Sequence, residues 1–145
     1  MQTFLPYQDF YKSAEVLDKK REWKQVVEAA QILDVLEGRK AGYFNHPAIK
    51  MWVGYGEMFK LYFNVFLFVA KDQHKINTKY EYLPENTEKA IYPWWHGNEN
   101  FHRAMRARLI EKDKAFYLPL FPEDEGFNEG KYFWPVNETQ TFRII

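Results

Sequence analysis

The chain has 145 residues and no cysteine, and its formal net charge is zero, from 20 basic and 20 acidic residues. This length suits one domain, residues 1–145, whose core needs neither metal nor disulfide. The lack of cysteine excludes disulfide frameworks, thiolate metal sites and cysteine nucleophiles, and is typical of a reducing compartment. The balanced charge gives no overall sign of a polyanion partner, although three arginines gather within residues 101–110.

The start of the chain shows no signal-peptide pattern, and the longest apolar run, VFLFVA at Val65 to Ala70, is much shorter than a membrane span. We therefore expect a cytoplasmic protein with no membrane partner. Nothing in the composition indicates an oligomeric state.

The first predicted helical unit begins near Phe10 and ends at Gly38, where glycine is typical of a helix C-terminus. Asp9 or Ser13 can cap its start, and the pattern allows either one helix or two with a break near Asp18. A second long helix is predicted from Pro47, since proline favours the first helical position. Asn45 or His46 is its expected cap, and apolar residues recur at helical spacing as far as Val69.

Residues 72–95 are polar and contain two prolines, which predicts a long loop. A third helix, residues 99–117, follows a cap at Asn98 or Asn100. The tail from Lys131 is expected to be irregular and packed by its aromatic side chains. Together these elements predict an all-α fold, a compact single domain of three to four helices with long, ordered, aromatic-rich loops.

Arg21, Lys24, Gln25 and Glu28 fall on one side of the first long helix at 100° per residue. They could be solvated pairs and nothing more. However, Ile32 and Val35 continue the same side with apolar residues, which indicates that these four line a cleft. A cleft with an acid, amides and cations suits an anionic ligand such as a phosphodiester, with Glu28 placed as a base. The arginines of residues 101–110 and Lys50 are candidate partners.

The four histidines show no metal-binding spacing, so we expect neither a metal site nor a cofactor. His46 at a helix start is typical of a cap or a structural residue. His102 lies beside Arg103 and Arg106, which makes it the better functional candidate.

Several segments follow one another along the chain: TFLPY, LDKKR followed by KQ and QIL, NHPAIKMW followed by GY, FH followed by arginines, EKDKAFY and WPV. In this order they resemble the pyrimidine dimer DNA glycosylase family of the endonuclease V type. The resemblance is specific to a group of small, uncharacterised bacterial and phage relatives. It implies a compact all-α fold and an enzyme that cuts the glycosidic bond of a damaged pyrimidine and then nicks the abasic strand.

The resemblance also implies roles for particular residues. The α-amine at the chain start would attack the sugar and form a Schiff base, assisted by a glutamate of the first long helix. Gln2 is large and should leave Met1 in place, so the amine would be that of Met1. The Arg21 and Glu22 pair matches the family motif, whereas Glu28 lies on the polar side, so both glutamates remain candidates, with Lys24 as a second possible nucleophile.

The remaining candidates would hold phosphates of damaged or modified DNA, from which a base is flipped out. They are Arg21, Gln25, His46, Lys50, His102, Arg103 and Arg106. Two other functions stay open: a non-catalytic module that binds nucleic acid or nucleotide in the same cleft, and an enzyme for a small anionic substrate.

Overall fold

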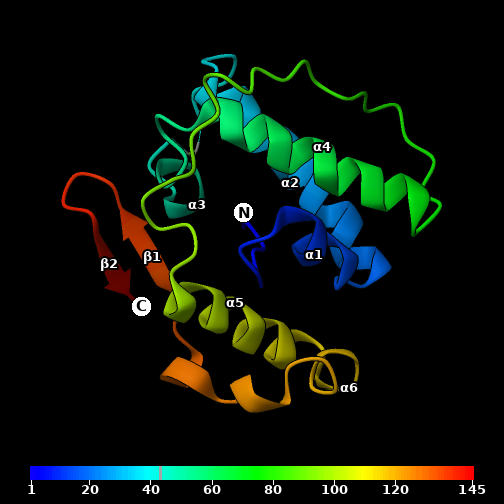
Figure 1. Ribbon diagram of the computed structural model, residues 1–145, viewed down its shortest axis with the longest axis vertical. Coiled ribbons are helices and arrows are strands. Elements are labelled where there is room, and N and C mark those ends of the chain that lie inside the picture. The colour runs from blue at the N-terminus through cyan, green and yellow to red at the C-terminus, as the bar shows by residue number, and fades with distance from the viewer. Residues whose placement is uncertain (43) are drawn as a thin grey trace.

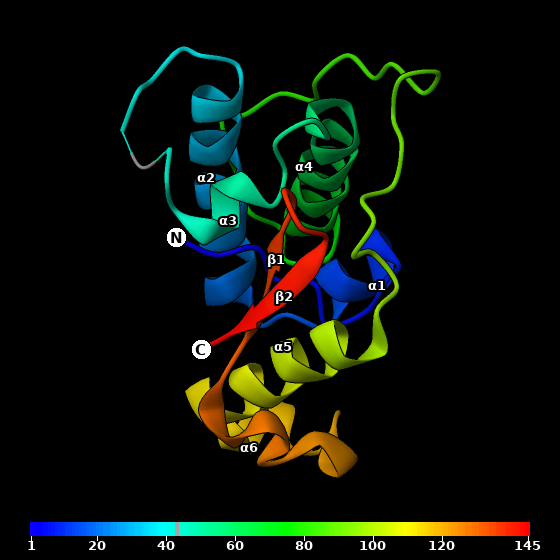
Figure 2. The same cartoon turned by 90° about the vertical axis from the view of Figure 1, so that its left-hand side faces the viewer.

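The computed structural model describes residues 1–42 and 44–145, and the description below concerns these residues. Two groups of helices lie on either side of the N-terminal segment (Figure 1, Figure 2). The first group is α1 (Phe10–Glu15), α2 (Lys19–Leu36), α3 (Pro47–Lys50) and α4 (Gly56–Asp72). The second is α5 (Glu99–Lys112) and α6 (Lys114–Tyr117), followed by the short 3-10 turns η1 (Pro122–Asp124) and η2 (Phe127–Gly130).

The first helical unit is two helices, which settles the alternative that the sequence left open. Asp9 caps α1 by accepting the Lys12 N–H, and Asp18 caps α2 by accepting the Arg21 N–H. The Asp18 carboxylate also binds the Tyr117 hydroxyl of α6. The break at Asp18 is therefore fixed both by a local cap and by a distant partner.

The prediction of one helix from Pro47 to Val69 is wrong. His46 does cap a helix there, but α3 ends at Lys50, and Gly54 adopts a left-handed backbone with φ of 87° before α4 begins. The short turn lets Trp52 enter the core, where it packs on Phe59 and Trp95 with ring centroids 4.6 and 5.0 Å apart. Helical periodicity could not reveal the break, because the residues on both sides of it are buried in the same core.

The helix expected at residues 99–117 is likewise divided. Asn98 caps α5, but Asp113 has a non-helical backbone, with φ of −153° and ψ of 84°, and caps α6 in turn. The predicted loop at residues 72–95 is confirmed, since no helix or strand forms there after the end of α4. Asn64 of α4 anchors this loop by accepting the Leu83 N–H and donating to the Leu83 carbonyl, at 2.8 and 2.9 Å.

The prediction of an all-α fold holds only in part. The chain is about 49% helical, but its tail is an antiparallel hairpin of β1 (Phe133–Val136) and β2 (Thr141–Ile144). The prediction of an irregular tail is therefore wrong. Its register pairs Phe133 with Ile144 and Val136 with Thr141. Pro135 argued against a strand in the sequence, because proline has no N–H to donate to a neighbouring strand. It is tolerated here because strands at sheet edges accept proline. The hairpin packs beside α3 and α5 (Figure 1).

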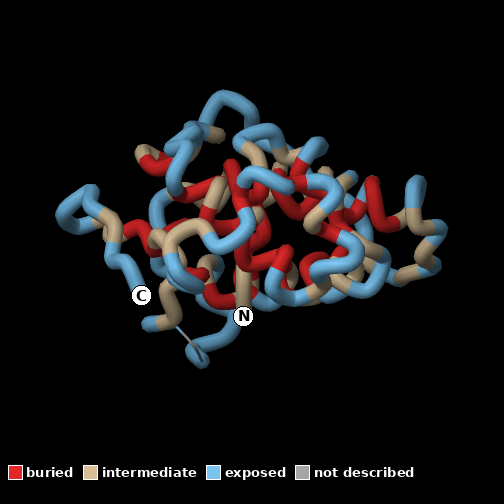
Figure 3. Tube along the Cα trace, turned by 90° about the horizontal axis from the view of Figure 1, so that it is seen from below, coloured by how far each residue is buried: buried red, intermediate tan, exposed pale blue. Residues whose placement is uncertain are grey.

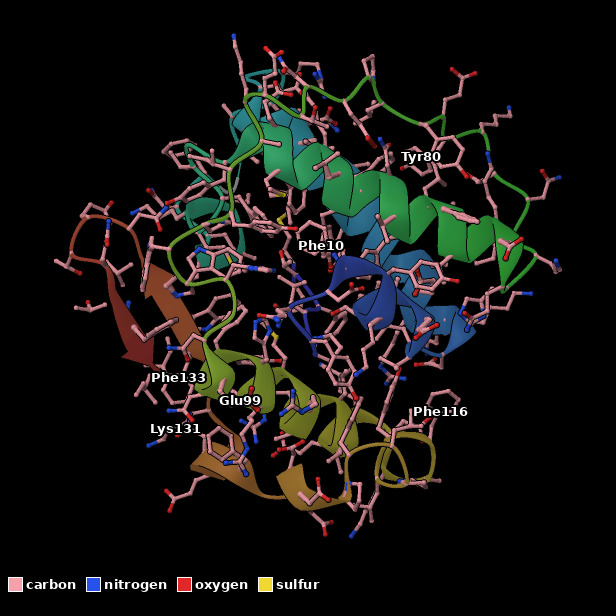
Figure 4. The ribbon with its side chains drawn as sticks, viewed as in Figure 1. Phe10, Tyr80, Glu99, Phe116, Lys131 and Phe133 are labelled. Atoms are coloured by element: carbon pink, nitrogen blue, oxygen red, sulfur yellow. The ribbon has the colours of Figure 1, made fainter. Side chains whose placement is uncertain are left out.

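The N-terminal segment passes into the interior rather than over the surface. In Figure 3 the tube changes from intermediate at Met1 to buried within a few residues, and Thr3 to Pro6 are all buried. Aromatic side chains surround it: Phe10, labelled in Figure 4, meets the ring of Tyr62 edge to face at 5.4 Å. No helix in the described part of the chain is long and apolar enough to cross a membrane.

The turn at Gly54 gives a direct test of the helix break. We expect Gly54→Ala to lower the free energy of unfolding by about 1 to 2 kcal/mol, because a Cβ strains the left-handed backbone although open space surrounds it. Gly56→Ala is the matched control: it lies at the start of α4 without a positive φ, and should be neutral or stabilising by about 0.5 kcal/mol. Urea unfolding of both variants measures the difference, and equal effects would contradict the assignment.

Candidate active site around the N-terminus

The backbone of the N-terminal segment is held by side chains from both helix groups. A buried segment outside any helix or sheet needs such bonds, because unpaired backbone groups are costly. Gln25 of α2 provides two: its Oε1 accepts the Phe4 N–H, and its Nε2 donates to the Gln2 carbonyl, both at 2.9 Å. The amide thus binds the segment much as a neighbouring strand would.

The carbonyls that follow are bound one by one. Tyr62 of α4 donates to the Phe4 carbonyl at 2.9 Å. From α5, His102 and Arg106 donate to the carbonyls of Leu5 and Pro6, each at 2.8 Å. Ser13 of α1 donates to the next carbonyl, that of Tyr7, at 2.8 Å. Since four helices contribute, the position of the first residue depends on the assembled fold.

This anchoring places Met1 at the edge of a surface hollow of about 530 Å³. The described residues that line it are Met1, Glu28, Gln31, Val35, Lys40, Gly42 and His46. Glu28 is 9% exposed, and its Oε2 accepts the Gln2 N–H at 3.0 Å. The amine end of the chain, one carboxylate and one imidazole therefore share a single open site.

His46 keeps its place in the hollow by capping α3. Its Nδ1 accepts the Ala48 N–H at 3.0 Å. Burial lowers the pKa of His46, and the positive charge of the chain terminus lowers it further, against the opposing effect of Glu28. The ring is therefore neutral near pH 7.

Glu22 lies elsewhere, although it is on the same helix as Glu28. It is fully buried, it is not among the residues lining the hollow, and neither of its carboxyl oxygens has a hydrogen-bond partner among the described residues. Burial, and secondarily the charge of Asp18, raise the pKa of Glu22 to about 9. Glu22 is therefore a neutral acid in the core at pH 7.

The remaining residues of the polar stripe do not meet in a cleft. Lys24 is exposed, and Arg21 binds Asp18 at 3.2 Å and the Lys112 carbonyl at 3.3 Å. Lys50 is exposed at the end of α3. The stripe is thus divided: Gln25 and Glu28 face the N-terminal segment, whereas the two cations lie toward solvent.

The candidates on α5 have intramolecular partners. Arg103 and Arg106 bind the two oxygens of Asp124 at 2.9 and 2.7 Å. Burial alone would raise the pKa of Asp124, but these hydrogen bonds outweigh it and hold the pKa below its usual value. His102 accepts the Gly97 N–H at 3.0 Å, and burial lowers its pKa to about 4, so it is a neutral donor to the segment.

Several contributors to this site escaped the sequence analysis. Tyr62 is part of the helical apolar pattern of α4, and its hydroxyl gave no separate signal. Trp52, whose Nε1 donates to the Thr3 hydroxyl at 3.2 Å, is another such case. Asp124 lies in an acidic stretch that offers no clue to its two arginine partners. No group of three or more potential ligands among the described residues could hold a metal ion.

Comparison with known families gives one match. The profile described as pyrimidine dimer DNA glycosylase matches residues 1–81, more than half of the chain. The chain belongs to this family. Neither the curated proteins nor the solved structures give a match. The family implies DNA glycosylase function on pyrimidine dimers, and hence a DNA substrate. The matched span contains Met1, Glu28 and His46, and thus all the described residues that line the hollow, whereas α5 lies outside it.

The two bonds of Gln25 predict a specific loss of stability. Gln25→Met keeps the length of the side chain but leaves the Phe4 N–H and the Gln2 carbonyl unpaired, which should cost about 2 to 4 kcal/mol. Lys24→Met introduces the same side chain at the neighbouring exposed position and should change stability by less than about 0.5 kcal/mol. Urea unfolding of the two variants provides the comparison. Similar losses in both would show that the amide does not anchor the segment.

The buried Glu22 predicts an unusual dependence of stability on pH. Its folded pKa of about 9 is above the ordinary value of 4.5. Between these values the folded state holds a proton that the unfolded state releases, so stability falls as pH rises, by up to about 1.4 kcal/mol per pH unit. Glu22→Gln mimics the neutral acid at every pH. Its free energy of unfolding relative to that of the wild type should therefore rise by more than about 1 kcal/mol between pH 5 and pH 8.

Unfolding free energies at pH 5, 6.5 and 8 measure this gain. Glu15→Gln, at an exposed position of α1, is the control and should follow the wild type at every pH. A constant difference between Glu22→Gln and the wild type would show that Glu22 is not a buried neutral acid.

Proposed function

We propose that the protein is a DNA glycosylase with abasic-site lyase activity, in which the amine of Met1 is the nucleophile and Glu28 is the acid and base. The observation that carries this proposal is that Met1 and Glu28 line the same hollow, with Glu28 binding the N–H of the next residue, Gln2. An amine on a free chain end would sample many positions. Here the bonds of Gln25, Tyr62, His102 and Arg106 hold the backbone that follows it, which reduces the entropy lost on reaching a productive geometry.

The chemistry begins at C1′ of the damaged nucleotide. The lone pair of the Met1 amine forms a bond to C1′, and the bond from C1′ to the base nitrogen breaks, with the electron pair leaving on the base, which takes a proton from water. Glu28 accepts the proton that the new ammonium releases. The sugar is then joined to the enzyme as a secondary amine.

Ring opening and strand cleavage follow. The nitrogen lone pair forms the C1′=N bond as the C1′–O4′ bond breaks, and Glu28 returns its proton to O4′. Glu28, which is again a carboxylate, then accepts a proton from C2′, and the electron pair of this C–H bond expels the 3′ phosphate by elimination. Hydrolysis of the imine by water restores the amine. This sequence needs no cofactor, and one carboxylate beside the amine suffices for the proton transfers that form the Schiff base.

Lys24 is the weaker candidate for the nucleophile. It is exposed on α2 and is not among the residues lining the hollow. In addition, α-amines as a class lose their proton at lower pH than lysine side chains, which favours an α-amine near neutral pH. Glu22 is the weaker candidate for the acid, because its carboxyl group has no described partner and no opening to the hollow.

Trapping of the Schiff base tests the proposal. Protein with its native N-terminus is incubated with a duplex that contains an abasic site and with cyanoborohydride, and the adduct is located by mass spectrometry of the digest. We expect it on Met1. Glu28→Gln should form it at least about 100-fold more slowly, because general acid and base catalysis is lost. Glu15→Gln should match the wild type.

The other outcomes each contradict a part of the proposal. An adduct on Lys24 that disappears in Lys24→Gln would move the nucleophile to the surface of α2. No adduct from the folded wild type would favour the binding module over the enzyme. A duplex with a cyclobutane thymine dimer then tests base removal. An adduct with the abasic duplex but none with the dimer duplex would support the lyase activity and contradict the glycosylase activity.

A further inference from the structure

His46 occupies the hollow in a single tautomer. Because its Nδ1 accepts the Ala48 N–H at 3.0 Å, this nitrogen carries no proton. A neutral imidazole has one ring proton, which must therefore be on Nε2. The same hydrogen bond also fixes the ring in place, since it caps α3 directly ahead of Pro47.

A second contact restricts the ring from another side. The rings of His46 and Trp134 in β1 form a T-shaped pair at an interplanar angle of 90°, with centroids 6.4 Å apart. The hairpin and α3 thus both contact the imidazole, and Figure 2 shows these elements close to the N-terminus. Burial is the largest effect on the pKa of His46 and lowers it, so the cap and the Nε2 proton are present together at neutral pH.

The Nε2 donor has no partner in the described part of the protein. No hydrogen bond joins it to a described residue, whereas Nδ1 is occupied by the cap. The hollow therefore offers three complementary groups: the Met1 amine as nucleophile, the Glu28 carboxylate as acceptor, and the His46 N–H as donor. His46 cannot serve as a base, because Nε2 is already protonated and Nδ1 is engaged.

We propose that His46 donates its Nε2–H to the ring oxygen O4′ of the deoxyribose that Met1 attacks. This proposal rests on the proposed function, which places C1′ at the amine. O4′ is bonded directly to C1′, so it is the acceptor nearest to the attacked carbon, whereas the base leaves from the opposite side. The hydrogen bond stabilises the negative charge that develops on O4′ as the C1′–O4′ bond breaks. No proton is transferred from His46, and the proton that O4′ finally takes comes from Glu28.

Two non-reactive abasic analogues isolate this contact from the chemistry. The tetrahydrofuran analogue keeps the ring oxygen, and the cyclopentane analogue has the same ring without it; neither can form a Schiff base. We expect the wild type to bind a duplex with the tetrahydrofuran analogue about five- to tenfold more tightly than the cyclopentane duplex, which corresponds to one hydrogen bond.

Two variants of His46 that retain the cap of α3 test whether the preference between the two duplexes depends on the imidazole. His46→Asn and His46→Ser both cap helices well, but neither side chain reaches as far as the imidazole Nε2. Both should fold with near-wild-type stability, bind the two duplexes equally, and form the Met1 adduct with a true abasic site about 100-fold more slowly. Two variants are used in case one of them has a folding defect. Comparing the wild type and each variant with both duplexes removes any effect of the substitution that is common to the two duplexes.

The results separate this proposal from the proposed function. Equal binding of the two analogues by the wild type, or an unchanged preference in both variants, would overturn the role of His46 even where the adduct on Met1 forms. A preference that depends on His46 without any adduct would instead support sugar recognition and contradict the lyase chemistry. Nitrogen NMR of the imidazole provides a further check, since a proton on Nδ1 in the free protein would overturn the proposal.

Discussion

The structure depends on satisfying the backbone of a buried extended segment at the very start of the chain. Thr3 to Pro6 lie in the interior without a neighbouring strand, so side chains must supply the hydrogen bonds that a sheet would give. The side-chain amide of Gln25 supplies two of them, because it accepts the Phe4 N–H and donates to the Gln2 carbonyl. A helix side chain that is polar and buried would ordinarily be costly, but here it removes two larger costs in the backbone.

This arrangement joins the folding of the protein to its proposed chemistry. The bonds that stabilise the core are the same ones that hold Met1 beside Glu28 and His46. They come from both helix groups, and the Arg106 that binds the Pro6 carbonyl is itself fixed by Asp124. The helix α5 therefore supports the site although it lies outside the span of the family match, residues 1–81. Loosening of either group would release the first residue.

Environment, rather than residue type, distinguishes the titratable groups. Glu22 and Glu28 are six residues apart on one helix, yet Glu22 is a neutral acid without a described partner, whereas Glu28 lines the hollow and accepts the Gln2 N–H. His46 and His102 are both neutral, but His46 accepts through Nδ1 and His102 accepts through Nε2. Each tautomer is set by the backbone N–H that the ring accepts, so the remaining donor of each ring has a defined direction.

The local features of the fold could be predicted from the amino-acid sequence. Each helix start was narrowed to two candidate caps, of which the structure selects Asp9, His46 and Asn98. These candidates, the loop at residues 72–95 and the family resemblance follow from short-range patterns, because capping and periodicity are properties of neighbouring residues. The identity of the polar side chains that enter the core could not be predicted in this way, because it depends on how the helices pack. The break at Gly54, the hairpin at the tail, the separation of Gln25 and Glu28 from Lys24 and Arg21, and the pairing of Arg103 and Arg106 with Asp124 all depend on contacts between distant segments. Such contacts leave no periodic trace in the chain, since a buried amide and an exposed lysine can occupy adjacent positions of the same helix.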